Sequence, residues 1–262
     1  MGDGEVFVKR RTGAPAGFFE WEAAGLRWLA EPAGGPTVVE VRAVTPGSIT
    51  LTRLDPVRPD RSAAERFGRH LAALHAAGAD AFGAPPPEWR DPTGWIGRQS
   101  LPLGRWDRWG AFYATARLLP YVRAAVDNGN LGRDGATVVE RVCDRLAAGE
   151  FDDDRPPARI HGDLWGGNLL YAGSGRPGDM VQAVLIDPAA HGGHGQTDLA
   201  MLELFGTPHL EVLAGAYAQA AGLPSDWASR TGLHQLHPLL VHAVSHGPSY
   251  AQEAVAVARR YA

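Results

Sequence analysis

The segment RIHGDLWGGNLLY, residues 159–171, constrains the fold of this chain more than any other stretch. It sets a His, an Asp, three glycines and an Asn between two apolar runs that are typical of strands. A further apolar run, MVQAVLID, follows at residues 180–187 and ends in an acid, Asp187. A hydrophobic strand that ends in an aspartate puts that side chain at the edge of a cleft, so the pattern predicts two strands that border an acidic cleft.

Asp163, Asn168 and Asp187 are the residue types that phosphoryl transfer to a hydroxyl group requires. One carboxylate, here Asp163, orients the hydroxyl and accepts its proton. The amide oxygen of Asn168 and the carboxylate of Asp187 are hard oxygen ligands of the kind that Mg²⁺ prefers. Glycine turns that contain Asp and Asn are also common on protein surfaces, and on these residues alone the two interpretations are about equally good. The strand that ends in Asp187 favours the catalytic one.

The beginning of the chain supplies a cation for such chemistry. Lys9, the only lysine among 25 basic residues, ends the strand-like run EVFVK at residues 5–9. An amphipathic helix is predicted over residues 16–30, with Glu22 on its inward face and Glu20 on its outward face. Because an unpaired buried carboxylate is costly, we expect Glu22 to pair with Lys9, which would then hold nucleotide phosphates. The alternative is an ordinary strand-end lysine with a glutamate at the rim.

The rest of the pattern predicts an α+β fold with a small β-rich lobe, residues 1–54, and a larger, mainly helical lobe, residues 55–262. Two β-rich runs at 37–44 and 48–54 complete the small lobe. In the large lobe Ser62 and Glu65 form a capping box that would open the first helix. Its helices are expected at 62–77, 107–127, 134–148 and from 196 to the end, with breaks near 207–210 and 223–226. Residues 79–105 read as a long ordered loop, and the acidic run 152–154 as a solvated turn.

Composition excludes several classes of function. A net charge of −4 gives no electrostatic footprint for nucleic acid or an anionic membrane. No run approaches the roughly 20 apolar residues of a membrane span, and the N-terminus has no apolar signal core. The single cysteine, Cys143, excludes an internal disulfide framework and a cysteine-based zinc site. We therefore expect a cytoplasmic protein with neither nucleic acid nor membrane as a partner.

Several stretches together resemble a known family. They are VFVKRR (6–11), FEWEAAGLRWLA (19–30), HLAALH (70–75), WDRWGAFYATARLLP (106–120), IHGDLWGGNLL (160–170) and IDPAAHGGHGQTDLAMLELFG (186–206). On these residues the chain resembles the fructosamine kinase (ketosamine-3-kinase) family, relatives of the aminoglycoside phosphotransferases with a protein-kinase-like two-lobe fold. HGDL and the following Asn are shared by many small-molecule kinases, whereas the tryptophan of HGDLWGGN and the last stretch are more specific to ketosamine kinases.

The resemblance implies ATP-dependent, Mg²⁺-dependent phosphorylation of the 3-hydroxyl of ketosamines, which are products of amine glycation. The phosphorylated adduct decomposes and frees the amine, so the implied role is repair, and the partner is a small ketosamine or a glycated protein amine. The implied site residues are Asp163 as base, Asn168 and Asp187 as metal ligands, Lys9 with Glu22 at the phosphates, Thr52, Arg53 and Leu54 as the hinge that meets adenine, and Trp165, His161, Asp107 and His194 on the acceptor side. For Trp165 a place in the core is an equal alternative, as is a turn role for His194.

One feature departs from the family. Family members have two more strands before the lysine strand, with a glycine-containing loop over the phosphates, whereas eight residues precede Lys9. Gly2 and Gly4 cannot form that hairpin in so short a segment, so the small sheet is expected to lack its first two strands. Two other functions therefore stay open: a kinase for another hydroxylated amine, such as an aminoglycoside or a choline-like compound, and a non-catalytic kinase-like binding protein. The oligomeric state stays open as well.

Asp198 and four histidines near the end of the chain carry further titratable side chains. Asp198 precedes the apolar run LAMLELF, where it would either anchor the catalytic loop through hydrogen bonds or serve as an ordinary helix N-terminal acid. Four histidines follow at 234, 237, 242 and 246. Their steps of three, five and four do not share one helix face, and no HExxH pattern is present. We interpret them as ordinary polar or core histidines.

Overall fold

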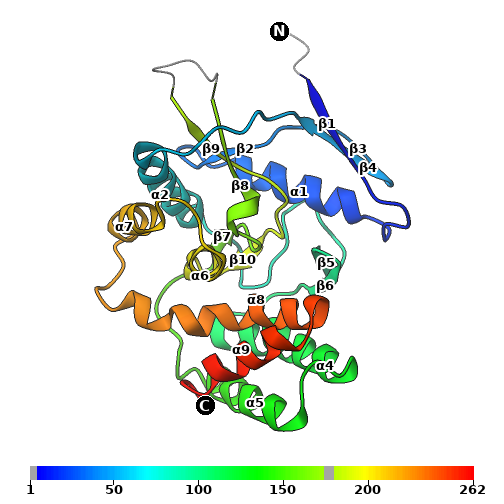
Figure 1. Cartoon of the computed structure of the whole chain (residues 1–262), viewed down its shortest axis with the longest axis vertical. Helices are drawn as coiled ribbons and strands as arrows, with labels where there is room; N and C mark the ends of the chain where they lie inside the picture. Colours follow the sequence, from blue (N-terminus) through cyan, green and yellow to red (C-terminus); the bar gives the residue numbers. More distant parts are fainter. Residues whose placement is uncertain (1–4, 174–179) are drawn as a thin grey trace.

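A three-stranded antiparallel sheet, in the order β1–β4–β3, forms the small lobe at the top of Figure 1. The computed structural model describes residues 5–173 and 180–262, so Gly2 and Gly4 lie outside the described residues. The strands are β1 (Val6–Arg10), β3 (Val41–Thr45) and β4 (Ser48–Thr52). Helix α1 (Phe18–Ala30) covers one face, where its Phe19 packs in one apolar cluster with Ile49 and Leu51 of β4. Within the described part, β1 is an edge strand.

The predicted continuous strand at 37–44 is wrong, because the chain changes sheets there. The first piece, β2 (Thr37–Val38), pairs in parallel with β9 (Gln182–Leu185), and the second is β3. Val38 and Val39 are consecutive apolar residues, and they break the alternation that one strand would need. The backbone N–H of Val39 still donates to the carbonyl of Leu185 at 3.0 Å. Through β2, therefore, the small lobe adds a strand to the sheet of the large lobe.

The first helix of the large lobe is α2 (Arg61–Ala76), which packs against α7 (Leu210–Ala220). The apolar residues of α2 that recur at steps of three and four are all buried: Ala64, Phe67, Leu71 and Leu74. The predicted capping box is wrong. Asp60, whose backbone is extended, caps the helix through its Oδ1, which accepts the Ala63 N–H at 2.6 Å. Ser62 instead accepts a hydrogen bond from Arg66, and Glu65 pairs with Arg69.

The segment predicted as a loop at 79–105 contains a hairpin of β5 (Thr93–Ile96) and β6 (Gln99–Pro102). A two-residue turn, Gly97–Arg98, joins the strands, and Gly97 has a φ of 56°, in the left-handed region that glycine tolerates. Each strand contains a glycine or a proline, which hides the strand signal in the sequence. The prediction of a loop was therefore wrong at the hairpin.

The lower part of the molecule in Figure 1 is helical. A buried cluster with Tyr113, Leu118 and Val139 joins its helices, and the predicted helix at 107–127 is interrupted by a π-helical segment at Tyr113–Leu118. The helices here are α3 (Trp109–Phe112), α4 (Leu119–Asp127), α5 (Arg133–Ala148), α8 (Thr231–His246) and α9 (Pro248–Ala258), with a 3₁₀ turn at Trp227–Arg230. The breaks predicted near 207–210 and 223–226 are present.

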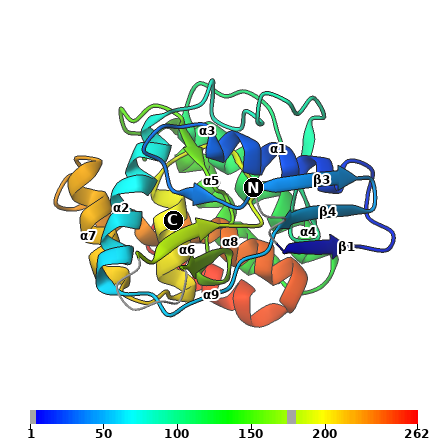
Figure 2. The same cartoon turned by 90° about the horizontal axis from the view of Figure 1, so that it is seen from above.

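Short strands and turns between the lobes carry the segment 159–171. Strand β7 (Ala158–Ile160) pairs with β10 (His191–Gly193), and β8 (Leu169–Ala172) pairs with β9. A 3₁₀ turn at Gly166–Asn168 precedes β8, and α6 (Gln196–Phe205) follows β10. Seen from above, these elements lie toward the middle of the molecule, between α2 and the β1–β4–β3 sheet (Figure 2).

Candidate active site

The predicted pairing of Lys9 with Glu22 is confirmed. The Lys9 Nζ lies 2.9 Å from Glu22 Oε2 and 3.0 Å from Asp187 Oδ1, so one ammonium joins β1, α1 and the end of the β9 segment. Glu22 is buried on the inward face of α1, as its periodicity predicts. Burial by itself lowers the pKa of Lys9, but the charges of Glu22 and Asp187 outweigh it and hold that pKa above its usual value. The cation is therefore fixed at the cleft.

Asp163 and Asn168 face each other across the turn that separates them. Asn168 Nδ2 donates to the backbone carbonyl of Asp163 at 2.8 Å and to its carboxylate at 3.2 Å. Burial raises the pKa of the Asp163 carboxyl to about 7, which the hydrogen bond from Asn168 opposes and the charge of Asp187 reinforces. A carboxylate with a pKa near neutrality suits a group that accepts a proton during catalysis.

Two buried residues hold this turn in place. Asp198, 1% exposed, accepts the backbone N–H of His161 at 2.8 Å and that of Gly162 at 2.9 Å. His75 Nε2 reaches the same carboxylate at 3.1 Å. The hydrogen bonds proposed for Asp198 are therefore present, although the residue also lies in the first turn of α6. His75 was not singled out in the sequence, because its contact with Asp198 spans 123 positions.

His161 lies underneath the turn. It is fully buried, its Nε2–H donates to the carbonyl of Ile186 at 2.9 Å, and its Nδ1 accepts the backbone N–H of Asp163 at 3.2 Å. These partners require the neutral ring, and burial lowers the pKa of His161 accordingly. The side chain thus joins the backbones next to Asp163 and Asp187, and it does not face the cleft as an acceptor-side residue would.

The oxygen ligands at the cleft fit a magnesium ion. Asp187, the second residue after β9, has a φ of 52°, and its Oδ1 lies 3.0 Å from Lys9 Nζ. Asn168 and Asp187 line the same cavity as Lys9, where the amide oxygen of Asn168 and the carboxylate of Asp187 would supply an all-oxygen donor pair. Mg²⁺ is usually held by one or two carboxylates together with phosphates and water. The donor set therefore fits the ion as long as phosphate oxygens complete its coordination.

Two cavities meet at Asp163. The first, about 370 Å³, is here called the lysine cavity, and its lining includes Lys9, Glu22, Asn168 and Asp187. The second, about 760 Å³, is called the outer cavity. It lies between the β5–β6 hairpin and helices α8 and α9, and its lining includes Phe205, His242, His246 and Tyr250. Four residues line both cavities: Gly97, Arg98, Asp163 and Trp165.

Trp165 is 44% exposed, so it is not a core tryptophan. A side-chain carbon at Gly167 would clash with its ring, and one at Gly166 would clash with the backbone carbonyl of Gly206, which explains the two glycines of WGGN. Asp107 and His194, by contrast, line neither cavity. Asp107 is exposed, and His194 is buried with its ring against Trp109 and His234. We therefore do not retain His161, Asp107 and His194 as acceptor-binding residues.

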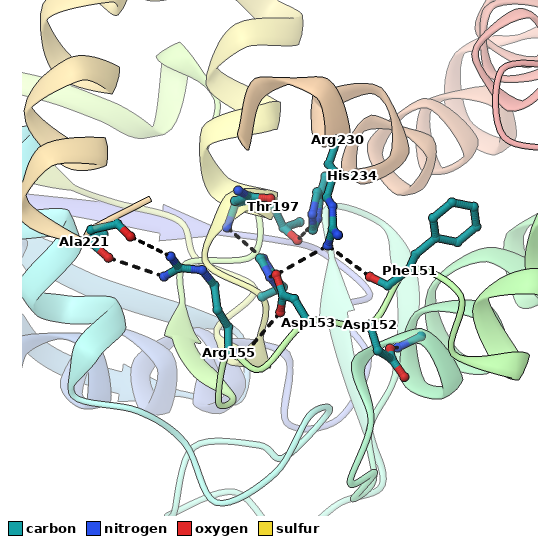
Figure 3. Close-up of polar contacts among 12 residues, drawn as sticks. Phe151, Asp152, Asp153, Arg155, Thr197, Ala221, Arg230 and His234 are labelled. Carbon is teal, nitrogen blue, oxygen red and sulfur yellow. Dashed lines mark hydrogen bonds and ion pairs between the residues drawn. The ribbon is translucent and has the colours of Figure 1, made fainter. Parts of the chain in front are cut away.

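The acidic run is bonded to the protein rather than only solvated. Asp152 accepts the Gly110 N–H at 2.7 Å and pairs with Arg108 at 3.1 Å. Asp153 accepts from His194 Nε2 at 3.2 Å and lies 3.5 Å from Arg230, whose other contact is the Phe151 carbonyl (Figure 3). The earlier interpretation as a solvated turn was wrong, because the partners come from residues up to 77 positions away.

The expected hinge, Thr52–Leu54, lines neither cavity. The backbone N–H of Thr52 donates to Glu40 at 3.0 Å and that of Arg53 to Glu5 at 2.8 Å. In the described part of the chain, only the N–H of Leu54 among these three makes no such hydrogen bond. Contact between adenine and this backbone therefore stays a prediction.

The whole chain matches a known family. The model of the family described as "Fructosamine kinase" matches residues 1–261.

The chain belongs to the fructosamine kinase family.

It is 33% identical over 261 residues to a "probable ketoamine kinase" of Synechocystis, across 97% of this chain and 81% of that protein. This family membership makes the chain a kinase-type transferase.

Solved structures support the same family. The chain matches the crystal structure of a "putative fructosamine-3-kinase" from Thermobifida fusca with a TM-score of 0.85 and 45% identity, over 97% of this chain and 84% of that one. The apoenzyme of a macrolide 2′-phosphotransferase from Brachybacterium faecium matches with a TM-score of 0.57 and 18% identity, over 97% of this chain and 84% of that one. At this low identity the match shows a shared fold and nothing more. The chain thus has the two-lobe α+β fold that the sequence predicts. None of the helices in the described ranges is both long and apolar enough to span a membrane.

Proposed function

We propose that this protein transfers the γ-phosphoryl group of ATP to the 3-hydroxyl of a ketosamine and so takes part in deglycation. The observation that carries the proposal is the meeting of the two cavities at Asp163, in a chain of the fructosamine kinase family. The lysine cavity would take the nucleotide phosphates and the outer cavity the acceptor. The lone buried thiol of Cys143 suits a reducing compartment such as the cytoplasm.

Each residue at the junction then has a role. Asp163 orients the acceptor hydroxyl and receives its proton, and Lys9, held by Glu22, binds the α- and β-phosphates. Asn168 and Asp187 would hold Mg²⁺, which supplies charge neutralisation on the phosphates. Hydroxyl oxygen, γ-phosphorus and leaving oxygen must lie in line, and the protein's task is to position them.

The outer cavity fits a sugar that carries an amine substituent. With about 760 Å³, it is large enough for an acceptor bigger than a monosaccharide. Trp165, exposed at the junction, presents a ring against which a sugar can pack. We propose a small ketosamine or a glycated side chain as the acceptor, with the ketose at Trp165 and the amine toward His242 and Tyr250.

The acceptor class is tested by measuring ADP formation with Mg·ATP and a panel of acceptors. The panel contains a fructosamine and a ribulosamine of the same amine, an aminoglycoside, choline, and the free amine as the control. Turnover with a ketosamine alone is expected, with the phosphate at O3 by NMR. Turnover with only the aminoglycoside or choline would show that the acceptor belongs to one of those classes and is not a ketosamine. A lack of both turnover and a thermal shift with Mg·ATP would favour the non-catalytic binding protein.

Replacing Lys9 should damage nucleotide use more than folding. In the Lys9→Met variant the phosphates lose a fixed cation, and kcat/KM for ATP is expected to fall about 10²- to 10³-fold, as when one charge-stabilising group is removed from an active site. The matched control is Arg10→Gln, the adjacent exposed cation on the opposite face of β1. Initial rates at varied ATP decide the matter, and a Lys9→Met value within threefold of the control would contradict the proposed role.

A further inference from the structure

Arg98 has a position that the reaction described so far does not use. It is the second residue of the two-residue turn at the tip of the β5–β6 hairpin, and its side chain is exposed. Among the residues that the structure describes, it is one of four that line both the lysine cavity and the outer cavity. Of the other three, Asp163 is the proposed base, Trp165 the proposed sugar platform, and Gly97 the other turn residue.

The charged residues that line the lysine cavity explain why an arginine at position 98 matters. Its lining contains three acids, Glu22, Asp163 and Asp187, and two cations, Lys9 and Arg98. Lys9 already pairs with Glu22 and Asp187. Within residues 5–173 and 180–262, Arg98 makes no ion pair and no side-chain hydrogen bond, so its guanidinium is available for an anion. A planar guanidinium binds phosphate oxygens through two parallel hydrogen bonds.

The hairpin that carries Arg98 is fixed at both strands. Trp21 Nε1 donates to the carbonyl of Trp95 in β5 at 2.9 Å. On β6, Tyr121 donates to the Ser100 carbonyl at 2.8 Å, and Gln99 donates to Ser245 at 3.1 Å. The turn itself is left without such contacts, so a rigid base presents Arg98 between the two cavities. A group on a rigid element costs little reorganisation when it stabilises charge.

We propose that Arg98 is a catalytic residue that contacts the γ-phosphoryl group as it passes from the lysine cavity to the outer cavity. This inference rests on the proposed kinase function and goes beyond it. In the transfer, the bond between the γ-phosphorus and the oxygen bridging to the β-phosphate breaks, and its electron pair leaves with ADP. A bond forms between the phosphorus and the acceptor oxygen, whose proton passes to Asp163. Arg98 neutralises charge on the equatorial oxygens of the phosphoryl group, as an arginine finger does in GTPases.

The test compares Arg98→Gln, Arg98→Lys and Arg98→Ala with Arg90→Gln. Arg90 is an exposed arginine of the same inter-helix segment that lines neither of these two cavities. Loss of the guanidinium should lower kcat for a ketosamine about 10²- to 10³-fold, with KM for ATP and for the ketosamine changed less than fivefold. Arg98→Lys should retain part of the rate, and added guanidinium should restore part of the Arg98→Ala rate, which a merely structural role would not allow.

Slow transfer of the phosphoryl group to water, measured without any ketosamine, separates the two proposals. A fall in this hydrolysis in Arg98→Gln supports the role of Arg98 even if the acceptor class is wrong. An unchanged kcat in Arg98→Gln would overturn the role of Arg98 and leave the kinase function standing. A rise in KM for the acceptor alone would also overturn the catalytic role, because this result would make Arg98 an acceptor-binding residue.

Discussion

The Asp163→Asn variant is expected to lose about three orders of magnitude in kcat, while it still folds and binds Mg·ATP. Positioned proton acceptors contribute about 10²- to 10⁴-fold to a rate, and the amide has the same shape but cannot take the hydroxyl proton. Burial raises the pKa of this carboxyl to about 7, so its charge is disfavoured in the folded state, and a neutral side chain of the same shape is expected to leave the protein at least as stable as the wild type near neutral pH. Steady-state kinetics and a thermal shift with Mg·ATP measure the two effects separately.

Asp107→Asn is the matched control for this variant. Asp107 is exposed, lies outside both cavities, and makes no ion pair within the described part of the chain. Its replacement should leave kcat within twofold. If Asp163→Asn kept more than a tenth of the wild-type kcat, Asp163 would not be the base. If Asp107→Asn lost activity as well, the acceptor would extend beyond the outer cavity, and Asp107 would return to the site.

Asp198→Asn is expected to lower the free energy of unfolding by about 3–5 kcal/mol, the range found when one partner of a buried charged network is removed. Its Oδ1 accepts the Gly162 N–H, and its Oδ2 accepts from His161 and His75. An asparagine has one amide oxygen, so in either orientation its NH₂ group faces a backbone N–H. Urea denaturation measures the loss, and kcat should fall with it, because a shift of about 1 Å near the chemistry can cost 10²-fold.

The pH dependence of this stabilisation has a defined sign. Burial opposes the charge of Asp198, but the hydrogen bond and charge of His75, together with the hydrogen bond from the His161 backbone, outweigh it and hold the pKa of Asp198 below its usual value. The stabilisation is therefore present above the ordinary aspartate pKa of about 4 and is lost as pH falls through the lowered value. The wild type and Asp198→Asn should thus differ most near neutrality and converge in acid.

Asp134→Asn is the control that separates anchoring from a helix-end effect. Asp134 occupies the first turn of α5, as Asp198 occupies the first turn of α6, but it is exposed. An acid at an exposed helix N-terminus contributes about 0.3–1 kcal/mol. A loss in Asp198→Asn no larger than that in Asp134→Asn would show that Asp198 is an ordinary helix-end acid and does not anchor the turn.

The sequence predicted the contacts that depend on the geometry of one element. Helical periodicity put Glu22 inward, and the only lysine ended the neighbouring strand, so their pairing was predictable. The strand before Asp187 likewise indicated the cleft. Contacts between distant elements carry no such local signal. The bond between His194 and Asp153 spans 41 positions, and the hairpin at Arg98 is held by Trp21, Tyr121 and Ser245, which periodicity along residues 79–105 does not reveal.

The pairing of β2 with β9 has a mechanical consequence. Val38 of the small lobe is in register with Leu185, two residues before Asp187. The segment that follows β9 is thus tied to the small lobe twice, by the β2–β9 pair and by the contact between Lys9 Nζ and Asp187 Oδ1 at 3.0 Å. Separation of the two lobes at this edge would have to break a strand pair as well as an ion pair.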